Sequence, residues 1–297
     1  MSQQSNMHSS QQQSADETYL QLVRHVLEFG ENRYQERTGT GTRALFAPTS
    51  LKFSLRDNDY PLLTTKFVPY KLVAGELFWM LSGSTSLADL HSHGVHFWDG
   101  DAARHGKGDD LGPVYGFQWR HFNAKYIDHK TDYRGQGVDQ IADLIDKLRM
   151  DPQGRRHILT AWNPAQNHLM ALPPCHAFAQ FYVNNHNELS CLVDQRSADI
   201  GLGLPFNIAS YALLTKLLAH TAGLAGCDTL TFQLGDAHVY LDHVEHLKKQ
   251  LERLPSPTTP KLNICGTRKY IDKYTLDDLQ LVGYSHRGVL PMPLSTG

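Results

Sequence analysis

The sequence predicts one mixed α/β (α+β) domain in which helices pack on a central sheet that is mixed or largely antiparallel. Three observations support this fold class. Helical and strand patterns interleave along the 297 residues without a strict strand–helix–strand order. No internal repeat and no linker-like segment divides the chain. Hydrophobic residues make up 41% and charged residues 20%, which is typical of a globular protein with a substantial core.

The N-terminal segment differs in composition from the rest of the chain. Residues 1–16 are rich in Ser and Gln, which predicts a disordered tail and leaves 17–297 as the folded domain. Within 17–29, apolar side chains recur at helical spacing, and Gly30 predicts the end of that helix. Residues 1–16 lack the basic and apolar regions of a secretory signal. Nowhere in the sequence does an apolar run reach about 18 residues. We therefore expect no membrane span.

The first half of the chain predicts one strand and two further helices. Residues 43–55 alternate as a strand does, whereas 70–82 and 138–150 have helical periodicity. Between these helices, aromatic residues with Gly and Pro at 97–119 predict a loop that forms a pocket wall. The polar segment 124–137 predicts a surface insertion.

The second half predicts the rest of the sheet and its covering helices. A strand is expected at 157–162, and 176–183 with 188–195 predict a hairpin around Asn184-Asn185-His186-Asn187. A strong helix follows at 207–222. The remaining expected elements are a strand at 229–234 and a helix at 241–253.

Charge and cysteine usage limit the function classes. The net charge of −2 gives no overall field that would attract nucleic acid or an acidic membrane. The cysteines include no C-x-x-C pair, which argues against a zinc site and a redox pair. We expect reduced thiols in a cytoplasmic protein. The 17 histidines are scattered, so we expect no metal. The four cysteines are Cys175, Cys191, Cys227 and Cys265.

One short region combines a nucleophile with a cation. Cys175 precedes His176, and Arg196 follows about twenty residues later, across the predicted hairpin, so we expect both His176 and Arg196 to activate this thiol. A thiolate adds to an electron-poor carbon, and an arginine holds an anion close to it. The pattern indicates covalent catalysis on a phosphorylated small molecule. The alternative is that Cys175 is a small apolar core residue.

Three further features have both a structural and a chemical interpretation. Glu76 lies among apolar residues of the 70–82 helix, so it is either an exposed glutamate or a buried one with a raised pKa. Arg155 and Arg156 form either a solvated surface pair or an anion clamp. The loop 37–42, RTGTGT, is a turn or a weak candidate for phosphate binding, because it lacks the Walker spacing.

Six motifs in sequence order give the chain a resemblance to a known family. They are RTGTGT (37–42), GPVYGFQWRHF (112–122), RR (155–156), LPPCHA (172–177), QRSADIGLGLPFNIASYALL (195–214) and GDAHVY (235–240). From residue 17 to about 284 the chain resembles thymidylate synthases. The resemblance implies a thymidylate synthase-like catalytic domain at 17–297. It also implies reductive methylation of dUMP to dTMP, with 5,10-methylenetetrahydrofolate as co-substrate and no metal. The insertion at 124–137 is similar to the eukaryotic branch.

The resemblance also implies which residues bind the nucleotide. A dimer is implied because the phosphate site is shared: Arg37 and Arg196 come from one subunit, and Arg155 and Arg156 from its partner. Ser197 adds a hydroxyl group. The remaining implied contacts are Asn207 to the base and His238 with Tyr240 to the ribose 3′-hydroxyl.

Catalysis and folate binding are implied at a second set of positions. Cys175 is the nucleophile that attacks carbon 6 of the base. Glu76 and Tyr115 handle protons near O4 and carbon 5. The implied folate contacts are Trp98, Leu172 and Asp199, the last also serving catalysis, with Lys66 near the folate tail. The amide of Asn207 offers one acceptor and one donor, which matches N3–H and O4 of uracil and not the reversed pattern of cytosine.

Four parts of the chain depart from the family pattern. Asp194 stands where Tyr is usual, and we expect a nearby cation to pair with it. Phe67 follows Lys66 where Arg is usual. The segment Asp99-Gly100-Asp101-Ala102 is atypical for a pocket edge. The C-terminus departs most, because it lacks the usual Tyr-x-Pro-His-Pro and apolar tail that closes over the ligands.

The altered C-terminus leaves alternatives to thymidylate synthesis. If water reaches the exocyclic methylene left on the base, the product is 5-hydroxymethyl-dUMP, as in the related hydroxymethylases. A weakened homologue that binds nucleotide or its own mRNA is a third interpretation. The presence of Cys175, Glu76, Arg196 and Asn207 argues against that third interpretation.

Overall fold

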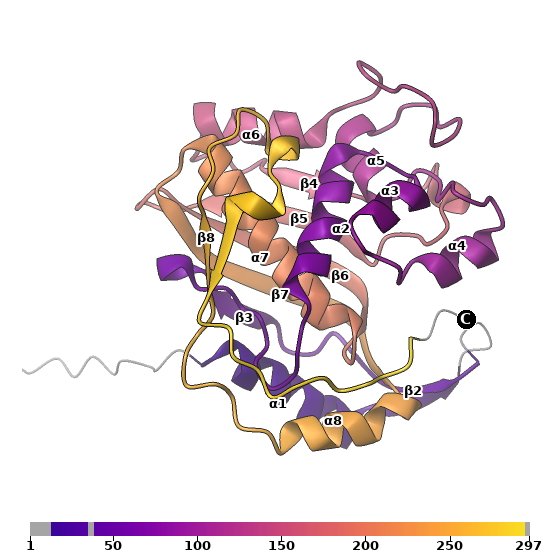
Figure 1. Ribbon diagram of the computed structural model, residues 1–297, viewed down its shortest axis with the longest axis vertical. Helices are drawn as coiled ribbons and strands as arrows, with labels where there is room; N and C mark the ends of the chain where they lie inside the picture. The colour runs from indigo at the N-terminus through magenta and orange to yellow at the C-terminus, as the bar shows by residue number, and fades with distance from the viewer. Residues whose placement is uncertain (1–12, 35–38, 295–297) are drawn as a thin grey trace, which may run out of the picture.

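The computed structural model describes residues 13–34 and 39–294, and a seven-stranded mixed sheet organises them (Figure 1). The strand order is β1-β2-β7-β6-β5-β4, with β3 also paired to β7. Only β6 and β7 pair in parallel among these strands, and the others pair antiparallel. The expected fold class is confirmed. The strands are β1 (Glu31–Tyr34), β2 (Gly41–Phe46), β3 (Leu51–Ser54), β4 (Ile158–Thr160), β5 (His176–Val183), β6 (Glu188–Asp199) and β7 (Gly226–Tyr240).

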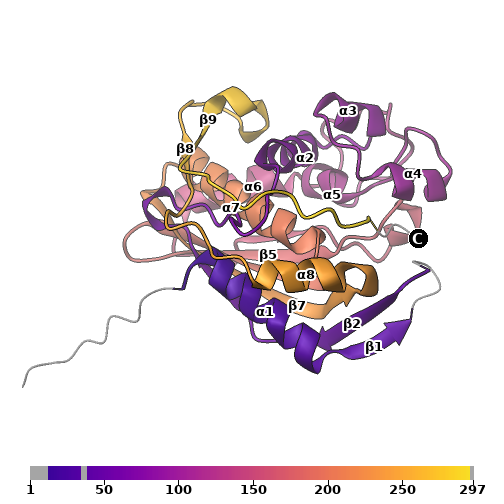
Figure 2. The same ribbon diagram turned by 60° about the horizontal axis from the view of Figure 1, so that its bottom comes forward.

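Helices cover one face of the sheet, as both views show (Figures 1 and 2). The central helix is α7 (Gly203–Ala222), which is apolar on nearly all sides and is therefore buried between β6, β7 and its neighbouring helices. The other helices are α1 (Ala15–Phe29), α2 (Tyr70–Ser82), α3 (Leu87–Ser92), α4 (Asp99–His105), α5 (Tyr115–His121), α6 (Gln140–Met150) and α8 (Val244–Leu251). No helix in the described ranges is long and apolar enough to cross a membrane.

The opposite face of the sheet carries exposed apolar side chains. In β5 and β6, alternate residues point inward and are buried, while the residues between them point outward. On the outward side, Ile158 is 41% exposed, Trp162 38% and Tyr182 59%. This outward sheet face is therefore an apolar surface that the described helices leave uncovered.

Several expected elements are confirmed, and others need correction. The 70–82 helix and the 176–183/188–195 hairpin form as expected. The tail expected at residues 1–16 extends too far, because α1 begins at Ala15 with Ser14 as its N-cap. Ser14 caps α1 through a capping box with Glu17, and buried Asp16 accepts hydrogen bonds from the backbone of Thr64 and Thr65. Residues 1–12 lie outside the described residues.

The single strand expected at 43–55 is wrong, because two strands form there. Both β2 and β3 pair with the long β7, and the chain turns between them at Ala47, whose φ is +49°. The loop expected at 97–119 holds the short helices α4 and α5. Their length of seven residues each is too short for sequence periodicity to identify.

The C-terminal segment returns across the molecule after a small second sheet. That sheet pairs β8 (Lys261–Ile264) with β9 (Leu279–Val282). From there the chain, yellow in both views, runs toward the side that carries α4 (Figures 1 and 2). Backbone hydrogen bonds attach it to the segment before α2: Arg287 N–H donates to Thr64 O, and Phe67 N–H to Gly288 O.

Candidate active site

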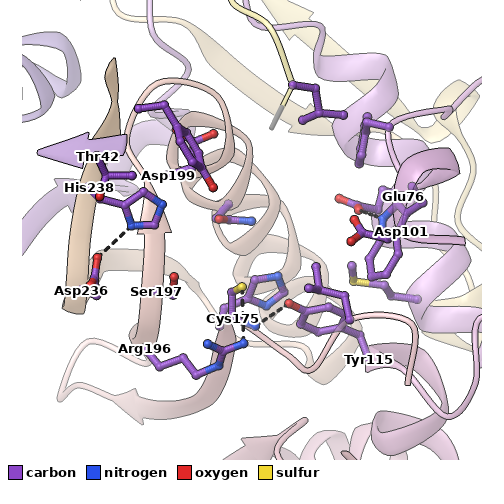
Figure 3. Close-up of a pocket in the computed structure, with 18 of the residues that line it drawn as sticks. Thr42, Glu76, Asp101, Tyr115, Cys175, Arg196, Ser197, Asp199, Asp236 and His238 are labelled. Atoms are coloured by element: carbon purple, nitrogen blue, oxygen red, sulfur yellow. Dashed lines mark hydrogen bonds and ion pairs between the residues drawn. The ribbon is translucent and has the colours of Figure 1, made fainter. Parts of the chain in front are cut away.

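One pocket collects most of the predicted site residues (Figure 3). It lies where the C-terminal ends of the parallel strands β6 and β7 meet α2, α5 and the start of α7. The strand register explains part of this assembly, because Ser197 pairs with Asp236 and Asp199 with His238. The predicted residues that line it are Glu76, Trp98, Tyr115, Leu172, Cys175, Arg196, Ser197, Asp199, Asn207, His238 and Tyr240.

The β5–β6 hairpin brings Cys175 and Arg196 together, as its sequence predicts. Arg196 N–H donates to Cys175 O at 2.9 Å, and its Nη2 lies 3.9 Å from Cys175 Sγ. The guanidinium is held by the carbonyl oxygens of Pro173 and Pro174, each at 2.8 Å, and lies over the ring of Trp162. A fixed positive charge beside the sulfur favours the thiolate over the thiol.

His176 does not supply the activating charge that its position beside Cys175 suggested. The ring is buried, stacks on Tyr115 with centroids 4.2 Å apart, and has Nδ1 3.0 Å from the hydroxyl of Tyr211. Burial lowers the pKa of His176 to about 3. The imidazole is therefore neutral at physiological pH, and Arg196 is the cation next to the sulfur.

Tyr115 holds the backbone of the nucleophile. Its hydroxyl oxygen accepts the Cys175 N–H at 2.7 Å. Burial raises the pKa of Tyr115 well above its ordinary value, and the nearby Cys175 adds to this effect. The phenol therefore keeps its proton and can donate it toward the pocket.

Glu76 is buried on the opposite wall of the pocket, on α2 (Figure 3). Its Oε1 accepts a 2.7 Å hydrogen bond from Trp98 Nε1. Burial raises the pKa of Glu76 to about 7, and the Trp98 hydrogen bond partly opposes that rise. Of the two sequence interpretations, the buried one is correct. A carboxyl group with this pKa can both accept and donate a proton near neutral pH.

Asn207 is oriented by a neighbouring amide. Gln195 Nε2 donates to Asn207 Oδ1 at 3.0 Å and to Ser197 O at 3.0 Å. One lone pair of Oδ1 is thereby used, which leaves the second lone pair and the NH2 group of Asn207 for a ligand. The side chain can therefore present one acceptor and one donor together.

The pocket also contains charged residues that sequence reasoning missed. His238 Nδ1 lies 2.9 Å from Asp236 Oδ1, and Arg33 Nη1 lies 3.4 Å from Asp236 Oδ2. The hydrogen bond from His238, with the charge of Arg33, lowers the pKa of Asp236 despite its partial burial. The GDAHVY motif contained Asp236, but nothing in the sequence linked β1 to β7. Asp101, paired with Arg104, also lines the pocket.

Asp199 is an ionised carboxylate at the base of the pocket. Its Oδ1 accepts the backbone N–H of Gly201 at 2.9 Å and of Leu202 at 3.3 Å. Burial alone would raise the pKa of Asp199, but His243, His238 and the Leu202 N–H outweigh it and lower the pKa.

Other predicted residues lie elsewhere. Arg155 and Arg156 flank a separate surface cleft next to Lys147. Lys66 is buried and donates to Gly201 O, and burial lowers its pKa to about 8. Arg37 lies outside the described residues.

The structure shows what surrounds Asp194 and Phe67, two residues that depart from the family pattern. Asp194 is exposed on the outward sheet face, opposite Phe178, and has no ion-pair partner among residues 13–34 and 39–294. The cation expected beside Asp194 is therefore not found among the residues that the structure describes. Phe67 packs against His286, with ring centroids 4.7 Å apart.

A group of possible metal ligands lies outside the pocket lining. His91 of α3, His96 of the loop that follows and Asp99 at the start of α4 have ligand atoms within 4.8 Å of one another. His91 Nε2 lies 2.7 Å from Asp99 Oδ1, so the group already contains a hydrogen-bonded pair. It does not contact the candidate site residues Cys175, Arg196 or Asn207 through any interaction in the described structure.

Comparisons with known proteins agree with the geometry of the pocket. The family model described as "Thymidylate synthase" matches residues 17–296. Thymidylate synthase of Candida albicans is 47% identical, over 95% of this chain and 98% of that protein. The human enzyme of the same name is 49% identical, over 93% and 90%. That of equine herpesvirus 2 is 50% identical, over 93% and 97%. The chain therefore belongs to the thymidylate synthase family.

Proposed function

We propose that this chain methylates dUMP to dTMP, with 5,10-methylenetetrahydrofolate as donor of the one-carbon unit and of the hydride. The observation that carries this proposal is the pairing of two groups across one pocket. A cysteine beside a fixed guanidinium faces a buried carboxyl group whose pKa is about 7. A nucleophile and a neutral-range proton carrier are the two groups that activation of the uracil ring requires.

Cys175 begins the reaction as the nucleophile. Its thiolate forms a bond to carbon 6 of the base, and the electrons of the C5=C6 double bond move to O4 as an enolate. Carbon 5 thereby becomes nucleophilic and takes up the one-carbon unit. Loss of the carbon 5 proton then expels tetrahydrofolate and leaves an exocyclic methylene, which takes a hydride from the tetrahydrofolate to give the methyl group and dihydrofolate. After the hydride has completed the methyl group, the Cys175–carbon 6 bond breaks and regenerates the thiolate. The proximity of Arg196 to the sulfur supports the first and last steps.

Glu76 and Tyr115 move the protons of the reaction. Glu76 acts at O4, through water, because its carboxyl group gains and loses a proton near neutral pH. Tyr115 accepts the Cys175 backbone N–H and keeps its own proton, so it stays beside the reacting base. We assign it to the carbon 5 proton, which leaves by way of water.

Asn207 selects the base. Its Oδ1 accepts N3–H, and its NH2 group donates to O4, which is the pattern of uracil. The Gln195 hydrogen bond supports this role because it fixes which end of the amide faces the base. His238 and Tyr240 hold the ribose, and Arg196 with Ser197 and Arg37 binds the phosphate.

The opposite wall, together with Asp199 at the base of the pocket, fits a folate. Trp98 offers an aromatic face, Leu172 an apolar contact, and Asp199 an ionised acceptor for the amino groups of a pterin. Bound methylenetetrahydrofolate would supply the carbon and the hydride. Lys66 acts indirectly, because its ammonium group is bound to Gly201 O beneath the pocket. This position makes Lys66 a support of the Gly201 loop and leaves the folate tail to other groups.

A second copy of the chain completes the phosphate site. The exposed apolar residues of the outward sheet face support a dimer through that face. Arg155 and Arg156 precede β4 at the edge of this face and do not line the pocket of their own chain. They reach the partner's phosphate in the proposed arrangement. The outward position of Asp194 gives its carboxylate access to a cation from the partner.

Mixed dimers test the shared site. Dimers of a double variant, Arg155→Ala with Arg156→Ala, and dimers of Cys175→Ser are dissociated, mixed and allowed to reassociate, so that hybrid dimers form. Each parent is expected to be inactive, whereas hybrids contain one complete site. Statistical mixing should restore about a quarter of wild-type activity, since half of the dimers are hybrids with one working site of two. No recovery in verified hybrids would exclude the shared site.

The alternative product, 5-hydroxymethyl-dUMP, is not favoured. The family model and the relatives named above are thymidylate synthases. Leu294 of the C-terminal segment also lines the pocket, where an apolar side chain would help to exclude water. We further propose a cytoplasmic enzyme, because no disulfide joins any of its four cysteines.

Product analysis tests the proposed reaction directly. The enzyme is incubated with dUMP and methylenetetrahydrofolate, and dTMP is separated from 5-hydroxymethyl-dUMP while dihydrofolate absorbance is followed. Equal amounts of dTMP and dihydrofolate are expected, because the hydride comes from the folate. A hydroxymethyl product without dihydrofolate would show that water, and not hydride, ends the reaction. Cys175→Ser is the matched control, which should form neither product.

A further inference from the structure

A buried histidine outside the pocket lining contacts two segments that form the pocket. His243 ends the short 3-10 helix η4 (Leu241–His243) between β7 and α8, and its side chain is fully buried. Its Nε2 lies 2.7 Å from the carbonyl oxygen of Pro293. A carbonyl oxygen only accepts hydrogen bonds, so Nε2 carries a proton in this contact. Pro293 immediately precedes Leu294, which lines the pocket.

The other ring nitrogen faces the carboxylate at the base of the pocket. His243 Nδ1 lies 3.7 Å from Asp199 Oδ1, which is within ion-pair range but too long for a hydrogen bond. Nδ1 has no hydrogen-bond partner among the described residues. A lone pair on Nδ1 would be repelled by the carboxylate, whereas an N–H would be attracted. An imidazolium, protonated on both nitrogens, therefore interacts favourably with Pro293 O and with Asp199 at the same time.

The groups around His243 favour its protonated, cationic form. Burial lowers the pKa of His243, but the interaction with Asp199 outweighs burial and raises it, helped by Pro293 O and Asp242. Asp242 Oδ1 lies 3.8 Å from Nε2. Lys66 and His238 act on Asp199. The charged or titratable groups around the pair are Asp199 (β6), Asp242 (η4), Lys66 (before α2), His238 and Tyr240 (β7) and Tyr19 (α1).

The ring has little freedom to move. A Cβ atom at Gly201 would lie 2.3 Å from His243 Nδ1, so the backbone at Gly201 is packed directly against the imidazole. On another side, the ring of Tyr240 meets it edge to face, with centroids 5.4 Å apart. The imidazole is thus confined between the Asp199–Gly201 turn and a residue that itself lines the pocket.

We infer that His243 is a positioning residue that fastens the C-terminal segment to the base of the pocket, by donating to Pro293 O from one nitrogen while facing Asp199 with the other. The contact keeps Leu294 at the pocket and ties its position to the charge on Asp199. The effect on catalysis rests on the proposed function, because Asp199 and Leu294 would then enclose the folate. The attachment of the segment itself does not depend on that function.

Release of the C-terminus from the free enzyme tests the attachment without substrates. A carboxypeptidase is added to the full chain, and free leucine from Leu294 is measured over time. The variants are His243→Gln, whose amide reaches toward Pro293 O without a charge, and His243→Asn, which is too short to reach it. His246→Gln is the matched control, because His246 is a partly buried histidine of α8.

The expected rates follow the number of retained contacts. His243→Asn should release leucine at least about tenfold faster than the control, since it loses a charge-assisted hydrogen bond, and His243→Gln should be intermediate. Equal rates in His243→Gln and His246→Gln at every pH would overturn the inference. Because His243→Gln keeps the size of the side chain, it provides the test even if His243→Asn does not fold.

The pH dependence separates attachment by the imidazolium from simple packing. The pKa of His243 is raised in the folded protein, so its contribution is complete below the ordinary value of 6.5 and is lost as the pH rises through the raised value. Leucine release from the His246→Gln control should therefore accelerate over that range. The rate of His243→Gln relative to the control should fall toward one. A ratio that stays constant with pH would overturn the ionic part of the inference.

Steady-state kinetics connects the attachment to the proposed function. If His243 positions the segment over the folate, His243→Asn should raise KM for methylenetetrahydrofolate several-fold while KM for dUMP changes little. A purely structural defect would lower the active fraction and leave both KM values unchanged. Failure of the proposed reaction would abolish turnover in wild type as well, and the leucine-release result would still stand.

Discussion

The two sides of the pocket are built in different ways (Figure 3). The nucleotide wall, which we define as Cys175, Arg196, Ser197, Asn207 and His238, is carried largely by β6 and β7, with Cys175 just before β5 and Asn207 on α7. Backbone ladders fix the spacing of these strands, as the pairing of Ser197 with Asp236 illustrates. A small change in one side chain therefore leaves its neighbours in place.

The folate wall, which we define as Glu76, Trp98, Leu172 and Leu294, depends on contacts between segments far apart in the chain. Trp98 reaches Glu76 through one side-chain hydrogen bond, and Leu294 is held through the Pro293–His243 contact. Such contacts break more easily than a backbone ladder. In the proposed mechanism the nucleotide wall supplies the nucleophile, whereas the folate wall supplies the proton carrier Glu76 and the contacts that hold the folate.

The largest effect is expected on the nucleotide wall, at the nucleophile. Cys175→Ser replaces a thiolate with a poorly ionised hydroxyl group, so turnover should fall by about four orders of magnitude or more. dUMP binding should remain, because Arg196 is held by the carbonyl oxygens of Pro173 and Pro174. Turnover kinetics and equilibrium dUMP binding measure the two quantities. Near-wild-type turnover would rule out covalent catalysis.

Glu76→Gln should have the next largest effect, and it acts on the folate wall. Loss of the proton carrier should lower kcat by about 10²- to 10³-fold and remove the pH dependence near neutrality. The same change should stabilise the fold. Burial raises the pKa of Glu76 from 4.5 to about 7, so ionisation above pH 7 costs folding free energy on the order of 3 kcal/mol.

Thermal unfolding of Glu76→Gln at two pH values checks the sign. Folded Glu76 holds its proton more tightly than the unfolded chain does, so wild-type stability falls as the pH rises from 4.5 through 7. Gln cannot ionise and still accepts the Trp98 hydrogen bond. Its Tm should therefore exceed that of wild type at pH 8 and approach it at pH 4.5. A lower Tm at pH 8 would contradict a buried, ionisable Glu76.

Asn207→Asp should alter specificity more than it alters turnover. A carboxyl group in place of the amide can accept from the amino group of cytosine, so the ratio of kcat/KM for dUMP over dCMP should fall by about ten- to a hundredfold. The Gln195 hydrogen bond survives, since it uses an oxygen that Asp retains. Kinetics with both nucleotides provides the measurement. An unchanged ratio would mean that other groups select the base.

The difference between the two walls also explains which features the sequence predicted. The motifs around Cys175 and Arg196 lie on one hairpin, so local pattern was enough to bring them together. Arg33 was missed because it reaches Asp236 from β1, about two hundred residues away along the chain. His176 was misinterpreted for a related reason. Its neutral state follows from burial against Tyr115 and Tyr211, which no local pattern encodes.

The burial of Glu76 illustrates a similar limit. Its apolar neighbours in sequence allowed either exposure or burial, and only the packing of α2 against α5 and α7 decides between them. The short helices α4 and α5 escaped detection because each has only about two turns. Long, locally patterned elements were therefore predictable, whereas contacts across the folate wall were not.

Trp98→Phe should have a moderate effect that is confined to the folate wall. The ring face is kept, but the N–H that stabilises ionised Glu76 is lost, so the pKa of Glu76 should rise further. The neutral-range limb of the kcat profile should move upward by up to about one pH unit, with a change of several-fold at pH 7. The pH dependence of equilibrium dUMP binding, which does not involve covalent attack by Cys175, should not move. If this limb of the kcat profile does not shift, it reports the titration of a group other than Glu76.

The smallest effect is expected at Phe67→Arg, at the outer edge of the folate side. Phe67 packs on His286 of the C-terminal segment and stands where the family resemblance predicts arginine, so the change introduces a cation at the cost of an aromatic contact. Surface ion pairs contribute at most about 1 kcal/mol, and KM for a polyglutamylated folate should therefore fall by no more than about fivefold. The kcat value should stay constant, because Phe67 does not line the pocket that holds Cys175. Measurement at low and high salt adds a second check, since an ionic gain should weaken with ionic strength. A fall in kcat would show instead that the Phe67–His286 contact positions the C-terminal segment, and the folate wall would then extend to this edge.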